Sequence, residues 1–171
     1  MEKTKIYLSG PDRLLKGARE LFRQKKALCE RYDFELLEYP DELFELKDSF
    51  ENSQRIAYER LVLLKKCDVV IADARDFRSY VEPYSETAFE LGMGYALGKK
   101  LYSYMPDARV CQERYSGEKH YDERNRLVDE NGISFEPGPL NLMLEYSSTI
   151  VEGDLEDALK KVREDLRKGE A

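Results

Sequence analysis

DVVIA, the stretch Asp68–Ala72, defines the fold best. Its β-branched and small apolar residues fill both alternating sets of positions, which is typical of a strand buried on both faces at the centre of a parallel sheet. Asp73 follows directly, at the carboxyl end of this strand. Because parallel sheets bind ligands beyond the carboxyl ends of their strands, Asp73 is a candidate functional residue.

Further strands and helices alternate on both sides of this stretch. Four more strands are predicted, at 5–10, 34–39, 100–104 and 149–151. Amphipathic helices are predicted from Asp12 onwards and at 56–67, 85–97 and 154–167. This alternation predicts an α/β fold, with an open parallel five-stranded sheet in one domain, residues 1–171.

Composition and charge limit the possible partners. The chain has 28 basic and 35 acidic residues, a net charge of -7, so a polyanion such as DNA would be repelled. No apolar run approaches the length of about 18 residues that suggests a membrane helix, and no signal peptide is recognisable. We therefore expect a cytoplasmic protein with no nucleic-acid and no membrane partner.

The cysteines and the histidine favour neither a disulfide framework nor a metal site. The three cysteines are widely spaced, and His120 is the single histidine. A Cys–His hydrolytic dyad stays formally open. The ordinary alternative is that these residues only pack or face solvent.

Residues 107–139 interrupt the alternating pattern. They form a polar stretch with Gly117, Gly132 and Gly138 and little periodicity. A loop of this length within one domain is usually functional, so we expect it to lie over the site. The alternative is a disordered insertion.

Two carboxylates are predicted to meet at the carboxyl edge of the sheet. Ser9-Gly10-Pro11 follows the first strand, Asp73 follows the central strand, and Glu90 lies in the next helix. One carboxylate can act as nucleophile and the other as acid, as in retaining glycosyl transfer. Taken singly, such an Asp is often a cap and such a Glu is usually solvated. Gly94, on the same helix face as Glu90, leaves room beside the carboxylate or allows close helix–sheet packing.

Five motifs resemble, in order, those of the nucleoside 2-deoxyribosyltransferases. They are KIYLSGP at 5–11, CDVVIAD at 67–73, Glu82-Pro83 with TAFELG at 87–92, ALGK at 96–99, and PLNLML at 139–144. The resemblance extends from residue 5 to about residue 160. It implies a flavodoxin-like fold with helices on both faces of the sheet, and base exchange on 2′-deoxyribonucleosides through a covalent deoxyribosyl-glutamate.

The resemblance also implies roles for individual residues. Glu90 corresponds to the nucleophile, Asp73 to the acid that helps the base leave, and Tyr7 to the tyrosine that orients the nucleophile. Asn141 corresponds to an asparagine that reaches the sugar from a neighbouring subunit, so a homo-oligomer with shared active sites is expected. The partners are a deoxynucleoside and a free nucleobase, with no metal and no organic cofactor. The residues expected to bind substrate are Ser9, Gly10, Pro11, Arg78, Tyr84, Gly94, Asn141 and Met143.

Two residues depart from the family pattern Glu-Pro-Asp-x-Gly-Thr-Ala-Phe-Glu. Tyr84 replaces the Asp that binds the sugar 5′-hydroxyl, and Glu86 replaces the Gly. A second carboxylate one helical turn before Glu90 disfavours the negative charge of the nucleophile unless it turns away. These departures predict a transferase that is slow on ordinary deoxynucleosides. They leave two alternatives open. One is a 5′-monophosphate N-glycosidase, because related N-glycosidases carry a hydroxyl residue at the position of Tyr84. The other is a non-catalytic nucleoside-binding protein.

Overall fold

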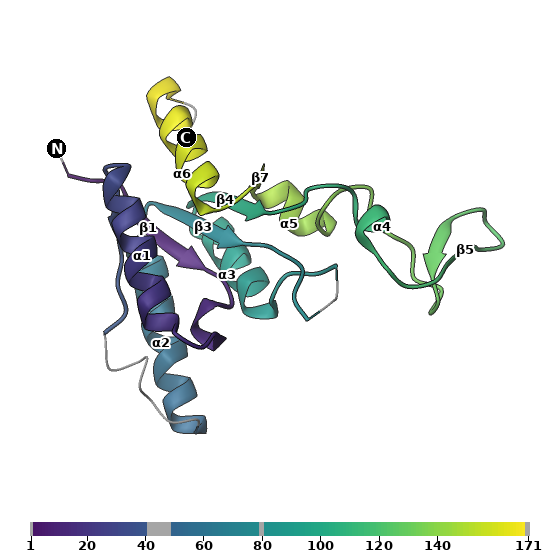
Figure 1. Ribbon diagram of the computed structural model, residues 1–171, viewed down its shortest axis with the longest axis horizontal. Helices are drawn as coiled ribbons and strands as arrows, with labels where there is room; N and C mark the ends of the chain where they lie inside the picture. The colour runs from purple at the N-terminus through teal and green to yellow at the C-terminus, as the bar shows by residue number, and fades with distance from the viewer. Residues whose placement is uncertain (1, 41–48, 79–80, 170–171) are drawn as a thin grey trace.

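Five parallel strands form the central sheet of the computed structural model, which describes residues 2–40, 49–78 and 81–169 (Figure 1). Their order across the sheet is β2-β1-β3-β4-β7. The strands are β1 (Lys5–Ser9), β2 (Glu35–Leu36), β3 (Val69–Asp73), β4 (Lys100–Met105) and β7 (Thr149–Glu152). The predicted open parallel sheet is confirmed, with β3 at its centre and buried along its whole length, although Asp68, just before it, is exposed.

Helices cover both faces of the sheet, as predicted. The helices α1 (Ala18–Arg31) and α6 (Leu155–Lys168) pack on one face with Ile6 and Ile71. The helices α2 (Phe50–Lys66), α3 (Ser85–Ala96) and α5 (Leu142–Ser147) lie on the other face with Tyr7 and Val70. Because successive strand residues point to opposite faces, β1 and β3 contribute to both cores.

The helix predicted from Asp12 is interrupted, so this prediction is wrong in part. A short 3-10 helix, η1, spans Asp12–Leu14, and Leu15 is then extended. Gly17 takes a left-handed conformation with φ +83°, and α1 begins only after it. Leu14 and Leu15 are consequently about half exposed, at 46% and 50%, instead of lining the core.

The helix predicted at 56–67 begins earlier, at Phe50. The Ser49 side chain caps it by accepting a hydrogen bond from the Asn52 backbone at 3.1 Å. Asn52 and Ser53, residue types that often cap helices, therefore lie inside the first turn. Most of the acidic stretch 41–51 falls outside the described residues.

Residues 107–139 form a projecting arm instead of a loop folded over the site (Figure 1). The arm holds α4 (Cys111–Arg114) and an antiparallel hairpin of β5 (Lys119–Tyr121) and β6 (Leu127–Asp129). At its base, Arg114 pairs with Asp76 and donates to the Pro139 carbonyl. The two strands of the hairpin pair over three residues each, and β5 is exposed along its whole length.

None of the helices in the described part of the chain has the length and apolar character of a bilayer-spanning segment.

Candidate active site

Glu90 lies on the face of α3 that packs against the sheet. The same face of α3 also presents Thr87, Leu91 and Gly94 to the interior, and Glu90 itself is only 3% exposed. A carboxylate is rarely buried to this degree without partners, because desolvation disfavours its charge. Three side chains supply those partners.

Two hydroxyl groups of β1 orient the Glu90 carboxylate. The Tyr7 hydroxyl donates to Oε1 at 2.5 Å, and the Ser9 hydroxyl donates to Oε2 at 2.5 Å. Burial, chiefly, together with the charges of Tyr39 and Glu90, raises the pKa of Tyr7 well above its ordinary value. Tyr7 therefore remains a hydrogen-bond donor at any physiological pH, in a position that suits the orienting role predicted for it.

Arg60, which the sequence analysis did not single out, is the third partner. Its Nε donates to Glu90 Oε1 at 2.7 Å and lies 3.3 Å from the Tyr7 hydroxyl. Burial would lower the pKa of Arg60, but the charges of Glu90, Tyr7 and Tyr39 and the hydrogen bond to Glu90 together offset this effect, and the pKa is raised. One signal was available: Arg60 precedes the buried Leu64 by one helical turn, so α2 places it on the inward face.

Glu86 contacts Arg60 as well, and its negative charge is compensated by neighbouring cations. It accepts hydrogen bonds from Arg60, from Tyr84 and, at 2.7 Å, from Arg13. Burial would raise the pKa of Glu86, but the bonds from Tyr84 and Arg13 and the charge of Arg60 lower it overall. Because the Arg60 guanidinium bridges Glu86 and Glu90, the expectation that Glu86 disfavours the Glu90 charge is not supported.

Asp73 stands at the same edge of the sheet. Ser9 pairs in register with Ala72, so Asp73 follows one residue beyond the hydroxyl that contacts Glu90. Asp73 is 1% exposed, and its Oδ1 accepts from the Arg75 side chain at 2.8 Å. Oδ2 lies 2.5 Å from the same guanidinium but receives no well-aligned hydrogen bond. Asp73 is therefore a buried carboxylate paired with one guanidinium at the carboxyl edge of the sheet.

The two glycines singled out in the sequence have different explanations. At Gly10 the φ angle is +156°, and an added Cβ would lie 2.9 Å from the Asp73 Cβ, so only glycine allows Asp73 its position. At Gly94 an added Cβ would lie 2.8 Å from the Leu101 side chain and 3.3 Å from that of Val70. Close helix–sheet packing thus explains Gly94, and the substrate-binding role expected for it is withdrawn.

Among the remaining predicted substrate-binding residues, Tyr84 contacts Glu86, whereas the others make their contacts elsewhere. Pro11 is buried and starts η1, its carbonyl accepting from the Leu14 backbone at 2.8 Å. Arg78 is exposed, with its guanidinium 5.1 Å from the Phe77 ring, and Arg13 is the cation that contacts Tyr84, at 3.3 Å. Asn141 caps α5 and lies 3.4 Å from Glu82, while Met143 is 74% exposed.

No Cys–His dyad is formed. Cys29, Cys67 and Cys111 are buried, and burial raises the pKa of all three thiols, to about 12 for Cys29 and about 11 for Cys67. His120 lies exposed in the arm hairpin. The three cysteines therefore serve packing and His120 faces solvent, which is the ordinary alternative to a dyad.

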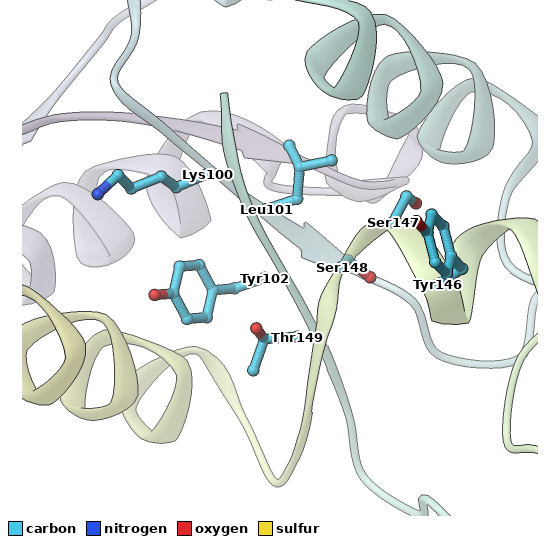
Figure 2. A pocket seen from close by; sticks show the side chains of 7 residues that line it. All are labelled: Lys100, Leu101, Tyr102, Tyr146, Ser147, Ser148 and Thr149. Carbon is cyan, nitrogen blue, oxygen red and sulfur yellow. The ribbon is translucent and has the colours of Figure 1, made fainter. Parts of the chain in front are cut away.

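A cavity of about 290 Å³ opens at the opposite edge of the sheet (Figure 2). Its lining comes from the amino ends of β4 and β7 and from the end of α5, including Lys100, Tyr146 and Thr149. Glu90 and Asp73 do not line this cavity. It also lies at the amino ends of the strands, where parallel sheets do not usually bind ligands.

The carboxyl edge of the sheet thus carries two buried carboxylates, Glu90 and Asp73, and retaining glycosyl transfer uses two such groups. The family described as nucleoside 2-deoxyribosyltransferase matches residues 6–143. This match covers most of the chain, and the protein belongs to the nucleoside 2-deoxyribosyltransferase family. Membership supports a general activity on the glycosyl groups of nucleosides.

Solved structures agree with this assignment. A 2-desoxiribosyltransferase from Leishmania mexicana is similar with a TM-score of 0.72 and 27% identity, over 94% of this chain and 97% of that one. A 2-deoxyribosyltransferase from Bacillus psychrosaccharolyticus has a TM-score of 0.55 and 18% identity, over 94% and 90% of the two chains, a likeness that concerns the fold. No curated protein matches the chain.

Proposed function

We propose that the protein exchanges the base of 2′-deoxyribonucleosides through a deoxyribosyl ester of Glu90. The observation that supports this proposal most strongly is the buried Glu90 carboxylate, which Tyr7 and Ser9 orient at the edge that also holds Asp73. Family membership supports this class of substrate, and the contacts of Glu90 support this chemistry.

The reaction proceeds in two matched steps. A Glu90 oxygen donates an electron pair to C1′, while the C1′–N bond breaks and its electrons leave with the base, which takes a proton from Asp73. A second base then attacks C1′, the Glu90 ester oxygen leaves as a carboxylate, and the proton on the incoming base returns to Asp73. Dividing the exchange in this way replaces one difficult step by two easier ones.

Base exchange requires that water be kept from the ester, and a neighbouring subunit is the proposed shield. The arm points away from the body, so it does not cover its own site (Figure 1). By contrast, α3 and α5 expose several large apolar side chains, a pattern typical of an interaction surface. They are Phe89, Tyr95, Leu142, Met143 and Tyr146.

The direct test is incubation with one deoxynucleoside and a different free base, followed by chromatography. We expect the new deoxynucleoside to accumulate with little free deoxyribose. Free deoxyribose without any exchanged product would identify a hydrolase instead. Binding of the nucleoside with no turnover would identify a non-catalytic member of the family.

Asn141 should complete the site of a neighbouring subunit. Its place beside the exposed Met143 and Leu142 on α5 puts it on the apolar surface described above. Mixing inactive Glu90→Ala subunits with Asn141→Ala subunits should restore part of the activity, up to about a quarter in randomly mixed dimers. The measurement is exchange rate against mixing ratio. Subunit exchange without recovered activity would contradict a shared site.

One contact favours a second candidate, the 5′-monophosphate N-glycosidase. Arg13 lies against Tyr84, the residue that stands where the family binds the 5′ end of the sugar. Arg13 is already paired with Glu86, however, and that carboxylate would repel a phosphate. We therefore expect at least tenfold higher kcat/KM for a deoxynucleoside than for its 5′-monophosphate. Parallel assays of the two substrates decide between the candidates, and the reverse preference would support the N-glycosidase.

A further inference from the structure

Arg60 joins two carboxylates that differ in burial. Its Nε donates to Glu90, and its Nη1 donates to Glu86. The side chains of Arg60 and Glu90 are 6% and 4% exposed, whereas that of Glu86 is 40% exposed. Tyr84 and Arg13 hold Glu86 from its other side, so its position does not depend on Glu90.

The proposed reaction changes the charge of this cluster. In the free protein two cations, Arg60 and Arg13, face two carboxylates, Glu86 and Glu90. When Glu90 becomes a sugar ester it loses its charge, and Arg60 loses its more buried partner. A buried guanidinium with no counter-charge is strongly unfavourable, because desolvation is no longer offset by an ion pair.

We propose that Glu86 is the counter-ion of Arg60 in the covalent intermediate, so that it stabilises the deoxyribosyl ester of Glu90 without touching the substrate. This inference rests on the proposed function. The Glu90–C1′ bond forms as the C1′–N bond breaks, the base leaves with the electron pair and a proton, and Glu86 stays ionised throughout. Arg60 then remains in place to receive Glu90 as a carboxylate when the second base attacks.

The contacts of Glu86 suit a permanent charge. Although burial opposes ionisation, the hydrogen bonds from Tyr84 and Arg13 and the Arg60 charge keep the pKa of Glu86 below its ordinary value. It therefore stays a carboxylate through the neutral range. Tyr84 and Glu86, the two departures from the family pattern, thus act together with Arg13 as one positioning unit.

The test measures the fraction of protein that carries the sugar. The Glu86→Gln and Glu86→Ala variants are mixed with excess deoxynucleoside and quenched rapidly, and the adduct is quantified by intact mass spectrometry. The affinity for the nucleoside is measured separately by calorimetry. We expect the adduct fraction to fall about tenfold, equivalent to about 1.4 kcal/mol, with the Kd of the nucleoside changed less than threefold. Glu156→Gln, which removes the carboxylate of an exposed pair with Arg31, is the matched control and should leave both values unchanged.

A rescue experiment separates a charge effect from a structural one. Formate should restore part of the adduct fraction in Glu86→Ala, because it can place a carboxylate between Arg60 and Arg13, whereas chloride at the same ionic strength should not. An unchanged adduct fraction, a parallel loss of nucleoside affinity, or equal rescue by chloride would overturn the inference. If the parent protein itself forms neither adduct nor exchanged product, the proposed function fails, and that outcome is distinct from all of these.

Discussion

Glu90→Gln should reduce base exchange by at least about 10³-fold, because the amide cannot form the sugar ester that divides the reaction into two steps. The replacement is nearly isosteric and keeps the positions that contact Tyr7 and Ser9. The parent protein, treated with a slow 2′-fluorinated deoxynucleoside, should gain the mass of one sugar per chain. Peptide mapping should place that mass on Glu90.

Asp73→Asn provides the matched comparison for this prediction. An acid that assists departure of the base contributes about 10²–10⁴-fold, so this variant should exchange bases slowly but still form the Glu90 adduct. With a nucleoside whose base leaves readily, the Asp73→Asn variant should recover much of the parent rate of exchange. A sugar adduct on another residue, or exchange by Glu90→Gln at the parent rate, would remove Glu90 from the mechanism.

The central part of the fold could be predicted from the sequence because periodicity is strongest in elements that are buried on two sides. DVVIA at 68–72 and the apolar face of α6 follow simple rules of burial. Prediction was poorest where a local conformation overrides the apolar pattern. Gly17 breaks the helix predicted from Asp12, and the hairpin of the arm has only a three-residue pairing on each side.

Only those site residues that lie near strand ends or within motifs could be predicted from the sequence. Glu90, Tyr7 and Ser9 do meet, because β1 and α3 pack against each other. Arg60 was missed since a charged residue in an amphipathic helix is normally solvated, and its burial is explained by tertiary contacts with Glu90, Glu86 and Tyr7. Without Arg60, Glu86 would oppose the negative charge of the nucleophile, and the double change Tyr84→Asp with Glu86→Gly would accelerate exchange. With Arg60 and Arg13 in place, the same double change should slow it.

Arg60→Met should be the most destabilising single substitution in this cluster. It leaves the buried Glu90 with only neutral hydrogen-bond donors, and removing one partner of a buried ion pair costs about 3–5 kcal/mol. Glu90→Gln should cost only about 1 kcal/mol, because Arg60 keeps Glu86 as its partner. Urea unfolding followed by circular dichroism measures both free energies of unfolding.

A double variant tests whether the charge of Glu90 causes this loss of stability. Adding Glu90→Gln to Arg60→Met removes the buried charge, so the double variant should be more stable at neutral pH than Arg60→Met alone, since Glu86 is partly exposed and keeps Arg13. A double variant that is no more stable would show that Arg60 serves packing and not the charge of the nucleophile.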